Sequence, residues 1–204
     1  MPKIVDPEAR RRAVAEAVFR VAARDGLENA SLRNVAEEAG LAIGSVRHYF
    51  RDHAELMIFA MDELARRIGE RIRTHAERLL SPASTIDRRA ATEELLEEFL
   101  PLDAARREEA VLLLTFTTAA RTQHELRPRA SKLDEDSRAL ITRVLGEAQR
   151  MGSLLQDTDI TLESLRLTAL LDGLLVQAVL QPDRTTPEVM RQVLQRHLDT
   201  LTGG

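Results

Sequence analysis

Apolar residues recur every three or four positions along almost all of the 204-residue chain, which is the period of an amphipathic α-helix. β-Branched residues are scattered, and no run alternates apolar and polar residues as a half-buried strand does. Ala, Leu, Arg and Glu, which all favour helix, dominate the composition. The pattern predicts an all-α protein with nine helices.

Proline, glycine and serine residues divide this pattern into helical segments. Asp6 and Ser31 can cap the first two helices, and Gly26 and Gly40 can adopt a positive φ where these helices end. The helices are expected at about residues 6–25, 31–39, 43–49, 52–80, 86–100, 103–123, 128–151, 161–180 and 187–201. The inward positions of the long fourth helix are Leu56, Phe59, Ala60, Leu64, Ile68 and Ile72.

The most informative stretch is ASLRNVAEEAGLAIGSVRHYF, residues 30–50. Gly40 tolerates the tight turn between two short helices, and Ala36 is small where their backbones approach each other. The pattern is typical of a helix-turn-helix, whose second helix enters the major groove of DNA. An ordinary hairpin of two helices with a solvated polar face is the alternative. The positions expected to pack between the two helices are Val35, Ala39, Leu41 and Val46.

The candidate recognition helix is rich in hydrogen-bonding side chains, namely Ser45, Arg47, His48 and Tyr49. An Arg side chain suits a bidentate contact with guanine, and backbone N–H groups at a helix start can bind a phosphate. Arg33 beside the turn and the Arg run at residues 10–12 are further candidates for phosphate contacts. Solvated Arg side chains explain both features nearly as well.

The net charge of −4 argues weakly against a nucleic-acid partner, but the first 53 residues carry nine Lys and Arg against eight Asp and Glu. The chain has no Cys, which excludes disulfides and thiolate metal sites. No signal-peptide pattern occurs, and the longest uncharged apolar run, residues 111–120, is far shorter than the roughly 20 residues that span a bilayer. We therefore expect a cytoplasmic protein without a membrane partner.

The titratable residues form no catalytic or metal-binding pattern. The acidic run from Glu93 to Glu98 is expected to be a solvated helix face. His75, His124 and His197 lie on separate expected helices, so no spacing typical of metal ligands arises. No phosphate-binding glycine loop, dinucleotide fingerprint or nucleophile elbow is present. The sequence thus predicts no catalytic residue, no metal site and no cofactor.

Residues 10–57 resemble the DNA-binding region of the TetR family of transcriptional repressors. The resemblance is carried by DGLENAS, LRNVAEEAGLAIGSVRHYF and RDHAEL, which combine an Ala-x-x-Ala-Gly core, a small-residue turn and an aromatic pair. The variant GSVRHYF, together with FLPLDAARREEA and LTALLDGLLVQAVL, resembles a branch of the family that includes choline-responsive repressors.

This resemblance implies a DNA-binding domain at residues 1–53 and a helical ligand-binding and dimerisation domain at residues 54–204. It implies a homodimer on a palindromic operator and a small-molecule effector that shifts the long fourth helix. Family members usually have Tyr where Arg47 stands, and a phosphate-contacting Lys where His53 stands, so a neutral His would weaken that contact. The predicted DNA-binding residues are Ser31, Arg33, Ala42, Gly44, Ser45, Arg47, His48, Tyr49 and His53.

The segment TALLDGLLVQAVL, residues 168–180, is apolar on nearly all sides, which is typical of a buried helix. Gly173 within it costs about 1 kcal/mol relative to Ala unless a close approach requires it. A four-helix dimer interface would require it, whereas a core helix of a monomer is the alternative. The predicted interface residues are Leu171, Gly173, Leu174, Gln177, Leu194 and Leu198.

The predicted ligand pocket combines apolar bulk with a few polar groups. Its candidate residues are Phe99, Phe116, Arg121 and Asp172. A quaternary ammonium ligand needs several aromatic rings around the cation, and aromatic residues make up only 3% of this chain. The choline-type ligand of the resembled branch is therefore not expected.

Three functions are compatible with these patterns. The first is a homodimeric repressor that is released by a small apolar or amphipathic ligand. The second is a TetR-like DNA-binding protein without an inducer, which is regulated by a partner or acts architecturally. The third is an all-helical ligand carrier or enzyme in which the helix-turn-helix is incidental. The absence of a cavity from the C-terminal helices would favour the second over the first.

Overall fold

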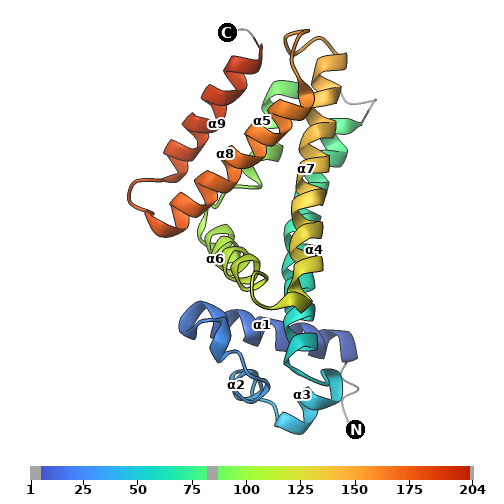
Figure 1. Cartoon of the computed structure of the whole chain (residues 1–204), viewed down its shortest axis with the longest axis vertical. Helices are drawn as coiled ribbons and strands as arrows, with labels where there is room; N and C mark the ends of the chain where they lie inside the picture. Colours follow the sequence, from blue (N-terminus) through green and yellow to red (C-terminus); the bar gives the residue numbers. More distant parts are fainter. Residues whose placement is uncertain (1–5, 82–86, 203–204) are drawn as a thin grey trace. The chain divides into compact units, whose positions relative to one another are not determined.

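The computed structural model describes residues 6–81 and 87–202, and this part of the chain is helical without a strand (Figure 1). Its α-helices are α1 (Pro7–Asp25), α2 (Leu32–Glu38), α3 (Ile43–Tyr49), α4 (His53–Leu80), α5 (Arg88–Glu97), α6 (Ala104–Ala119), α7 (Arg127–Arg150), α8 (Ile160–Leu180) and α9 (Pro187–Thr202). Two short 3-10 helices, Leu27–Asn29 and His124–Leu126, lie between them. The predicted all-α class with nine helices is confirmed within the described residues.

The chain forms two compact units. The first contains the chain up to Arg67 and residues 111–131, and the second contains residues 68–110 and the chain from Lys132 onward. Helices α4, α6 and α7 each contribute residues to both units. The predicted domains, residues 1–53 and 54–204, do not coincide with these compact units. The predicted division between DNA binding and ligand binding stays a prediction.

Local side chains fix the helix starts in the first unit. Asp6 Oδ1 accepts a hydrogen bond from the Glu8 backbone N–H at 3.0 Å, and Ser31 Oγ accepts one from the Asn34 N–H at 3.2 Å. Both side chains satisfy N–H groups that lack a partner within the helix. Gly26 follows α1 with a φ of 88°. The predicted caps of α1 and α2 are therefore confirmed.

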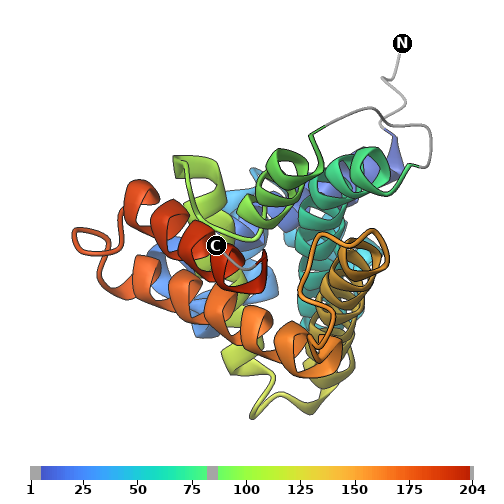
Figure 2. The ribbon, with the colours of Figure 1, turned by 90° about the horizontal axis from the view of Figure 1, so that it is seen from above.

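Helices α8 and α9 lie side by side in the second unit (Figures 1 and 2). One buried cluster in this unit joins α4, α5 and α7 through Ile72, Leu79, Leu95 and Val144. The apolar periodicity that predicted these helices thus marks the faces that they bury. Another buried cluster of the second unit includes Leu96, Leu100, Ile141, Leu145, Leu167, Leu171, Leu174, Met190, Leu194 and Leu198.

Helix α6 ends at Ala119, four residues before the expected end at residue 123. The Arg127 guanidinium donates hydrogen bonds to the carbonyl of Ala120 at 3.2 Å and to that of Arg121 at 2.9 Å. These bonds satisfy carbonyl groups that lose their partners where the helix stops. A contact from a residue beyond the helix therefore sets its end, and the periodicity of the helix itself does not reveal it.

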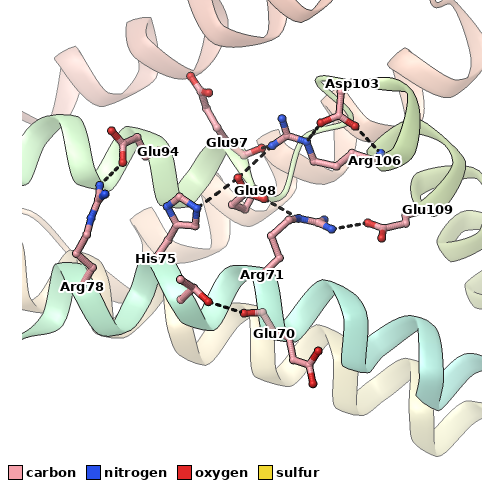
Figure 3. A network of polar contacts seen from close by, with 11 residues as sticks. Glu70, Arg71, His75, Arg78, Glu94, Glu97, Glu98, Asp103, Arg106 and Glu109 are labelled. Atoms are coloured by element: carbon pink, nitrogen blue, oxygen red, sulfur yellow. Dashed lines mark hydrogen bonds and ion pairs between the residues drawn. The ribbon is translucent and has the colours of Figure 1, made fainter. Parts of the chain in front are cut away.

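The acidic run at the end of α5 is mostly an ion-pairing and partly buried face, so the expected solvated face holds only for Glu94 (Figure 3). Arg71 of α4 bonds Glu98 at 2.6 Å and Glu109 of α6 at 2.8 Å. Arg106 of α6 also bonds Glu98, at 3.2 Å, and His75 Nε2 lies 3.7 Å from this carboxylate. The Glu98 side chain is only 12% exposed.

Two further acidic residues of this run pair with Arg residues of other helices, whereas Glu93 pairs with Arg89 of α5 itself. Glu94 contacts Arg78 of α4 (Figure 3), and Glu97 lies 3.2 Å from Arg191 of α9. Glu94, Glu97 and Glu98 are paired because neighbouring helices present Arg residues to them, a tertiary arrangement that the sequence of α5 alone does not encode.

Candidate nucleic-acid interface and ligand cavity

The turn between α2 and α3 is built on Gly40. Its φ is 65°, in the left-handed region that glycine adopts without steric cost. The Gly40 N–H donates to the Glu37 carbonyl at 3.0 Å, and the Leu41 N–H donates to the Ala36 carbonyl at 2.8 Å. This bond pair ends a helix by satisfying its last carbonyls. The predicted role of Gly40 in the turn is thus confirmed.

Helix α3 is held from behind by two fully buried side chains, Val46 and Phe50. The Phe50 ring lies 5.3 Å from the ring of Phe59 on α4. The Arg11 guanidinium lies 4.5 Å from the centroid of the Phe59 ring, a distance typical of a cation–π contact. Arg11 therefore takes part in packing within the fold, and the phosphate contacts of residues 10–12 stay a prediction.

The outer face of α3 presents polar and small residues to solvent. Tyr49 is half-buried, and its ring makes an edge contact with His48 at 5.3 Å. Arg47 and Arg33 have no carboxylate within ion-pair distance among the described residues, whereas Arg20 and Arg24 both bind Glu38, at 2.6 and 3.0 Å. The exposed residues are Ala42, Ile43, Gly44, Ser45, Arg47 and His48.

Two further predicted DNA-binding residues lie at helix starts. Ser31 is half-buried and caps α2, and the half-buried His53 is the first residue of α4. The Arg51 N–H donates to the Glu55 carboxylate at 2.9 Å, and the Glu55 N–H donates to Asp52 at 2.9 Å. The hydrogen bond from the Arg51 backbone, with the Arg51 guanidinium alongside, lowers the pKa of Glu55. The ionised carboxylate thus fixes the backbone next to His53.

The four predicted pocket residues do not share one compact unit. Phe116, which is fully buried, and the exposed Arg121 belong to the first unit, whereas Phe99 and Asp172 belong to the second. Asp172 lies on α8, where desolvation raises the pKa of its carboxyl group above the ordinary value and Asp134 adds to the effect. The structure does not bring these four residues together within either unit.

The second unit instead contains a cavity of about 350 Å³ between α4, α5, α7 and α9. Sequence reasoning missed it, because its aliphatic walls have the same pattern as a filled core. None of the four predicted pocket residues lines it. The lining residues are Leu79, Leu80, Arg88, Arg89, Thr92, Val144, Leu145, Glu147, Ala148, Met151, Ser153, Leu154, Leu198 and Thr202.

The predicted dimer residues divide into two groups. Leu171, Leu174, Leu194 and Leu198 are at most 9% exposed and pack in the core of the single chain, which leaves them no surface for a partner. They are buried because α8 and α9 pack on each other and on α5 and α7 within the single chain. Gly173 and Gln177 are exposed, as an interface requires.

The described residues contain no cluster of three or more His, Asp or Glu side chains suited to a metal ion. None of their helices is both long enough and apolar enough to cross a membrane.

A short helix with an exposed hydrogen-bonding face in a helix-turn-helix, followed by a helical unit with a cavity, is typical of a DNA-binding regulator. Residues 14–58 match the family model for bacterial regulatory proteins of the tetR family. Residues 88–203 match the model for the C-terminal domain of BetI-type transcriptional repressors. The chain belongs to the TetR family of transcriptional regulators, which are not enzymes, and it carries a BetI-type C-terminal domain.

Known relatives are similar over nearly the whole chain. The regulator PksA of Bacillus subtilis is 34% identical over 202 residues, covering 98% of this chain and 94% of PksA. The regulator BetI of Vibrio campbellii is 26% identical over 199 residues, covering 98% of this chain and 95% of BetI.

Solved structures agree with this assignment. A transcriptional regulator from Rhodococcus sp. Rha1 superposes with a TM-score of 0.80 at 29% identity, covering 95% of this chain and 96% of the other. A regulator from Saccharomonospora viridis in complex with choline gives a TM-score of 0.83 at 23% identity, over 95% of this chain and 97% of the other. The second likeness concerns the fold alone.

Proposed function

We propose that the chain is a homodimeric repressor that binds a palindromic operator and leaves it when a small molecule binds in the second unit. The observation that carries this proposal is the surface of α3, where hydrogen-bonding side chains face solvent while Val46 and Phe50 anchor the helix from behind. Kinship with BetI-type repressors supports the repressor role.

The exposure of the α3 side chains suggests a division of roles at the DNA. Arg47 and His48 are exposed and face outward, so we assign them to base edges in the major groove. Ala42 and Gly44 are small and leave the backbone at the start of α3 accessible. Arg33 and His53 are assigned to phosphates, whose contacts would position α3 on the DNA without distinguishing one base sequence from another.

The outward face of α8 supports a homodimer. Leu162, Leu165 and Leu180 are 59%, 49% and 66% exposed, and helical spacing puts them on the same face as Gly173. Apart from its chain neighbours and the nearby backbone of its own helix, a Cβ atom at Gly173 would meet no atom within 4 Å, so packing within the chain does not require glycine there. A second α8 packed on this face would bury the leucines and use the close approach that Gly173 permits.

The cavity in the second unit favours an effector over a regulator without one. Its volume of about 350 Å³ lies in the range of small-molecule sites. None of the described residues in its walls is aromatic, so a cage for a choline-type cation is not part of the proposal.

A mobility-shift assay with the DNA upstream of the protein's own gene tests the proposal at about 0.1 M salt. We expect a sequence-specific shift, and footprinting of the same complex should show protection related by a two-fold axis over two successive major grooves. If no sequence-specific complex forms at this or lower salt, the repressor function is refuted.

A further inference from the structure

We propose that the cavity of the second unit binds an anionic amphiphile, whose apolar chain packs between the helices and whose carboxylate binds Arg88. This inference rests on the proposed function, because it names the chemical class of the molecule that releases the operator.

The walls that face one another across the cavity are aliphatic. Leu79 comes from α4, Val144 and Leu145 come from α7, and Leu198 comes from α9. All four are at most 5% exposed, so the walls consist of buried apolar side chains. Aliphatic walls match a flexible alkyl chain, and each methylene moved from water onto such walls should tighten binding roughly fourfold.

The charged residues of the lining differ in their partners. Arg89 is bound by Glu93 at 2.6 Å and by Asp199 at 2.8 Å, and Glu147 is bound by Arg150. Their charges are therefore neutralised by neighbours outside the cavity.

Arg88 is the exception among the charged lining residues. Its guanidinium donates to the backbone carbonyl of Leu79 at 2.9 Å and to that of Ser81 at 3.5 Å, both of them uncharged acceptors. No carboxylate of the described chain lies within ion-pair distance of it. The cavity wall thus carries one half-buried positive charge without a counterion, which a ligand carboxylate can supply through charge-assisted hydrogen bonds.

The same residues argue against a quaternary ammonium ligand. Such a cation would face the charge of Arg88 and would find no aromatic ring among the described lining residues. Arg88 also links the site to α4, because it holds the carbonyls where that helix ends. A ligand that binds the Arg88 guanidinium therefore acts on α4, which continues into the first unit.

Calorimetry on the full-length protein without DNA tests this inference with three ligands of equal chain length below their micelle concentrations: decanoate, decanol and decyltrimethylammonium. We expect saturable binding of one decanoate per chain, weaker binding of decanol and no binding of the cation. Octanoate should bind about 15-fold more weakly than decanoate, since it lacks two methylenes.

Two variants and one control locate the site. Arg88→Gln should weaken decanoate at least tenfold and change decanol less than twofold, whereas loss of a purely structural Arg88 would affect both ligands alike. Ala148→Phe should fill the cavity and abolish binding of both ligands. Arg107→Gln, which removes an exposed Arg of α6 outside the lining, should leave both affinities unchanged. Thermal unfolding monitored by circular dichroism verifies that each variant folds.

Preference for the cation, absence of saturable decanoate binding, or equal losses of decanoate and decanol in Arg88→Gln would each overturn the inference. Operator binding is measured separately. Sequence-specific DNA binding without decanoate binding would refute the inference and leave the repressor function standing. Decanoate binding without any operator complex would refute the repressor function while the ligand site stands.

Discussion

Helices α3 and α8 each bury one face and expose the other, but their exposed faces have opposite chemistry. The outward side of α3 presents Ser45, Arg47 and His48, whereas that of α8 presents Leu162 and Leu165. A polar face with an unpaired Arg suits a hydrated polyanion, while the exposed leucines among polar residues on α8 suit contact with another protein. The buried faces explain the fold, and the exposed faces indicate which partner each helix meets.

The largest expected effect tests whether the α3 surface depends on its buried anchor. Phe50→Ala should destabilise the first unit by about 3–5 kcal/mol, because it removes a fully buried ring and leaves a cavity. Guanidinium unfolding followed by circular dichroism measures this loss. Tyr49→Ala, at the half-buried neighbouring position, should cost about 1 kcal/mol or less. Equal losses in the two variants would mean that α3 is not anchored through Phe50.

The next effect concerns the outward face of α8. Gly173→Leu should raise the dimer dissociation constant at least about 100-fold, since a large side chain would hold two α8 helices apart. Gly69→Leu is the matched control, because Gly69 is also an exposed glycine within a helix, and a Cβ atom added there would likewise meet no atom within 4 Å apart from its own helix surroundings. Analytical ultracentrifugation distinguishes the outcomes, and an intact dimer for Gly173→Leu would exclude this interface.

A smaller loss in unfolding free energy is expected when the ion-pair network around Glu98, in the second unit, is weakened. Glu98→Gln removes the charge shared by Arg71 and Arg106, at a site that is only 12% exposed, and should cost about 2 kcal/mol. Glu94→Gln removes one side of a pair in which both side chains are about half exposed, and should cost roughly 0.5 kcal/mol or less. Urea unfolding that ranks the two variants in reverse would contradict the structural role of Glu98.

The smallest effect concerns phosphate contacts beside α3. His53→Lys should tighten operator binding and steepen the slope of log K against log salt by about 1.8, because each protomer of the dimer gains one phosphate contact. Gln181→Lys adds the same charge in the second unit and should leave the slope unchanged. A salt titration of operator affinity measures both slopes, and identical slopes would remove His53 from the interface.

Local signals in the sequence were sufficient to predict the helix-turn-helix of α2 and α3. Ser31, Gly40 and Val46 predicted the cap, the turn and the buried contact from residues only a few positions apart. Such features depend on backbone preferences and side chains within one or two turns of helix, so a single sequence reveals them.

Features that depend on distant residues were not predictable. Glu98 meets Arg71 from 27 positions away, and nothing in the acidic run of α5 indicates that partner. Leu171 and Leu194 were predicted at a dimer interface, but the packing of α8 on α9 places them in the core of the single chain. The cavity escaped prediction because Val144 and Leu145 have the same periodicity whether the space beside them is filled or open.

The central claim is that α3 reads operator DNA, and fluorescence anisotropy with a labelled upstream fragment tests it most directly. Arg47→Ala combined with Tyr49→Ala should reduce operator affinity at least about 100-fold, to the level of unrelated DNA, since each lost base contact is worth about 1–3 kcal/mol. Arg184→Ala, at an exposed position in the loop between α8 and α9, should bind like the wild type. A folded double variant that keeps operator affinity within threefold of the wild type would contradict the claim.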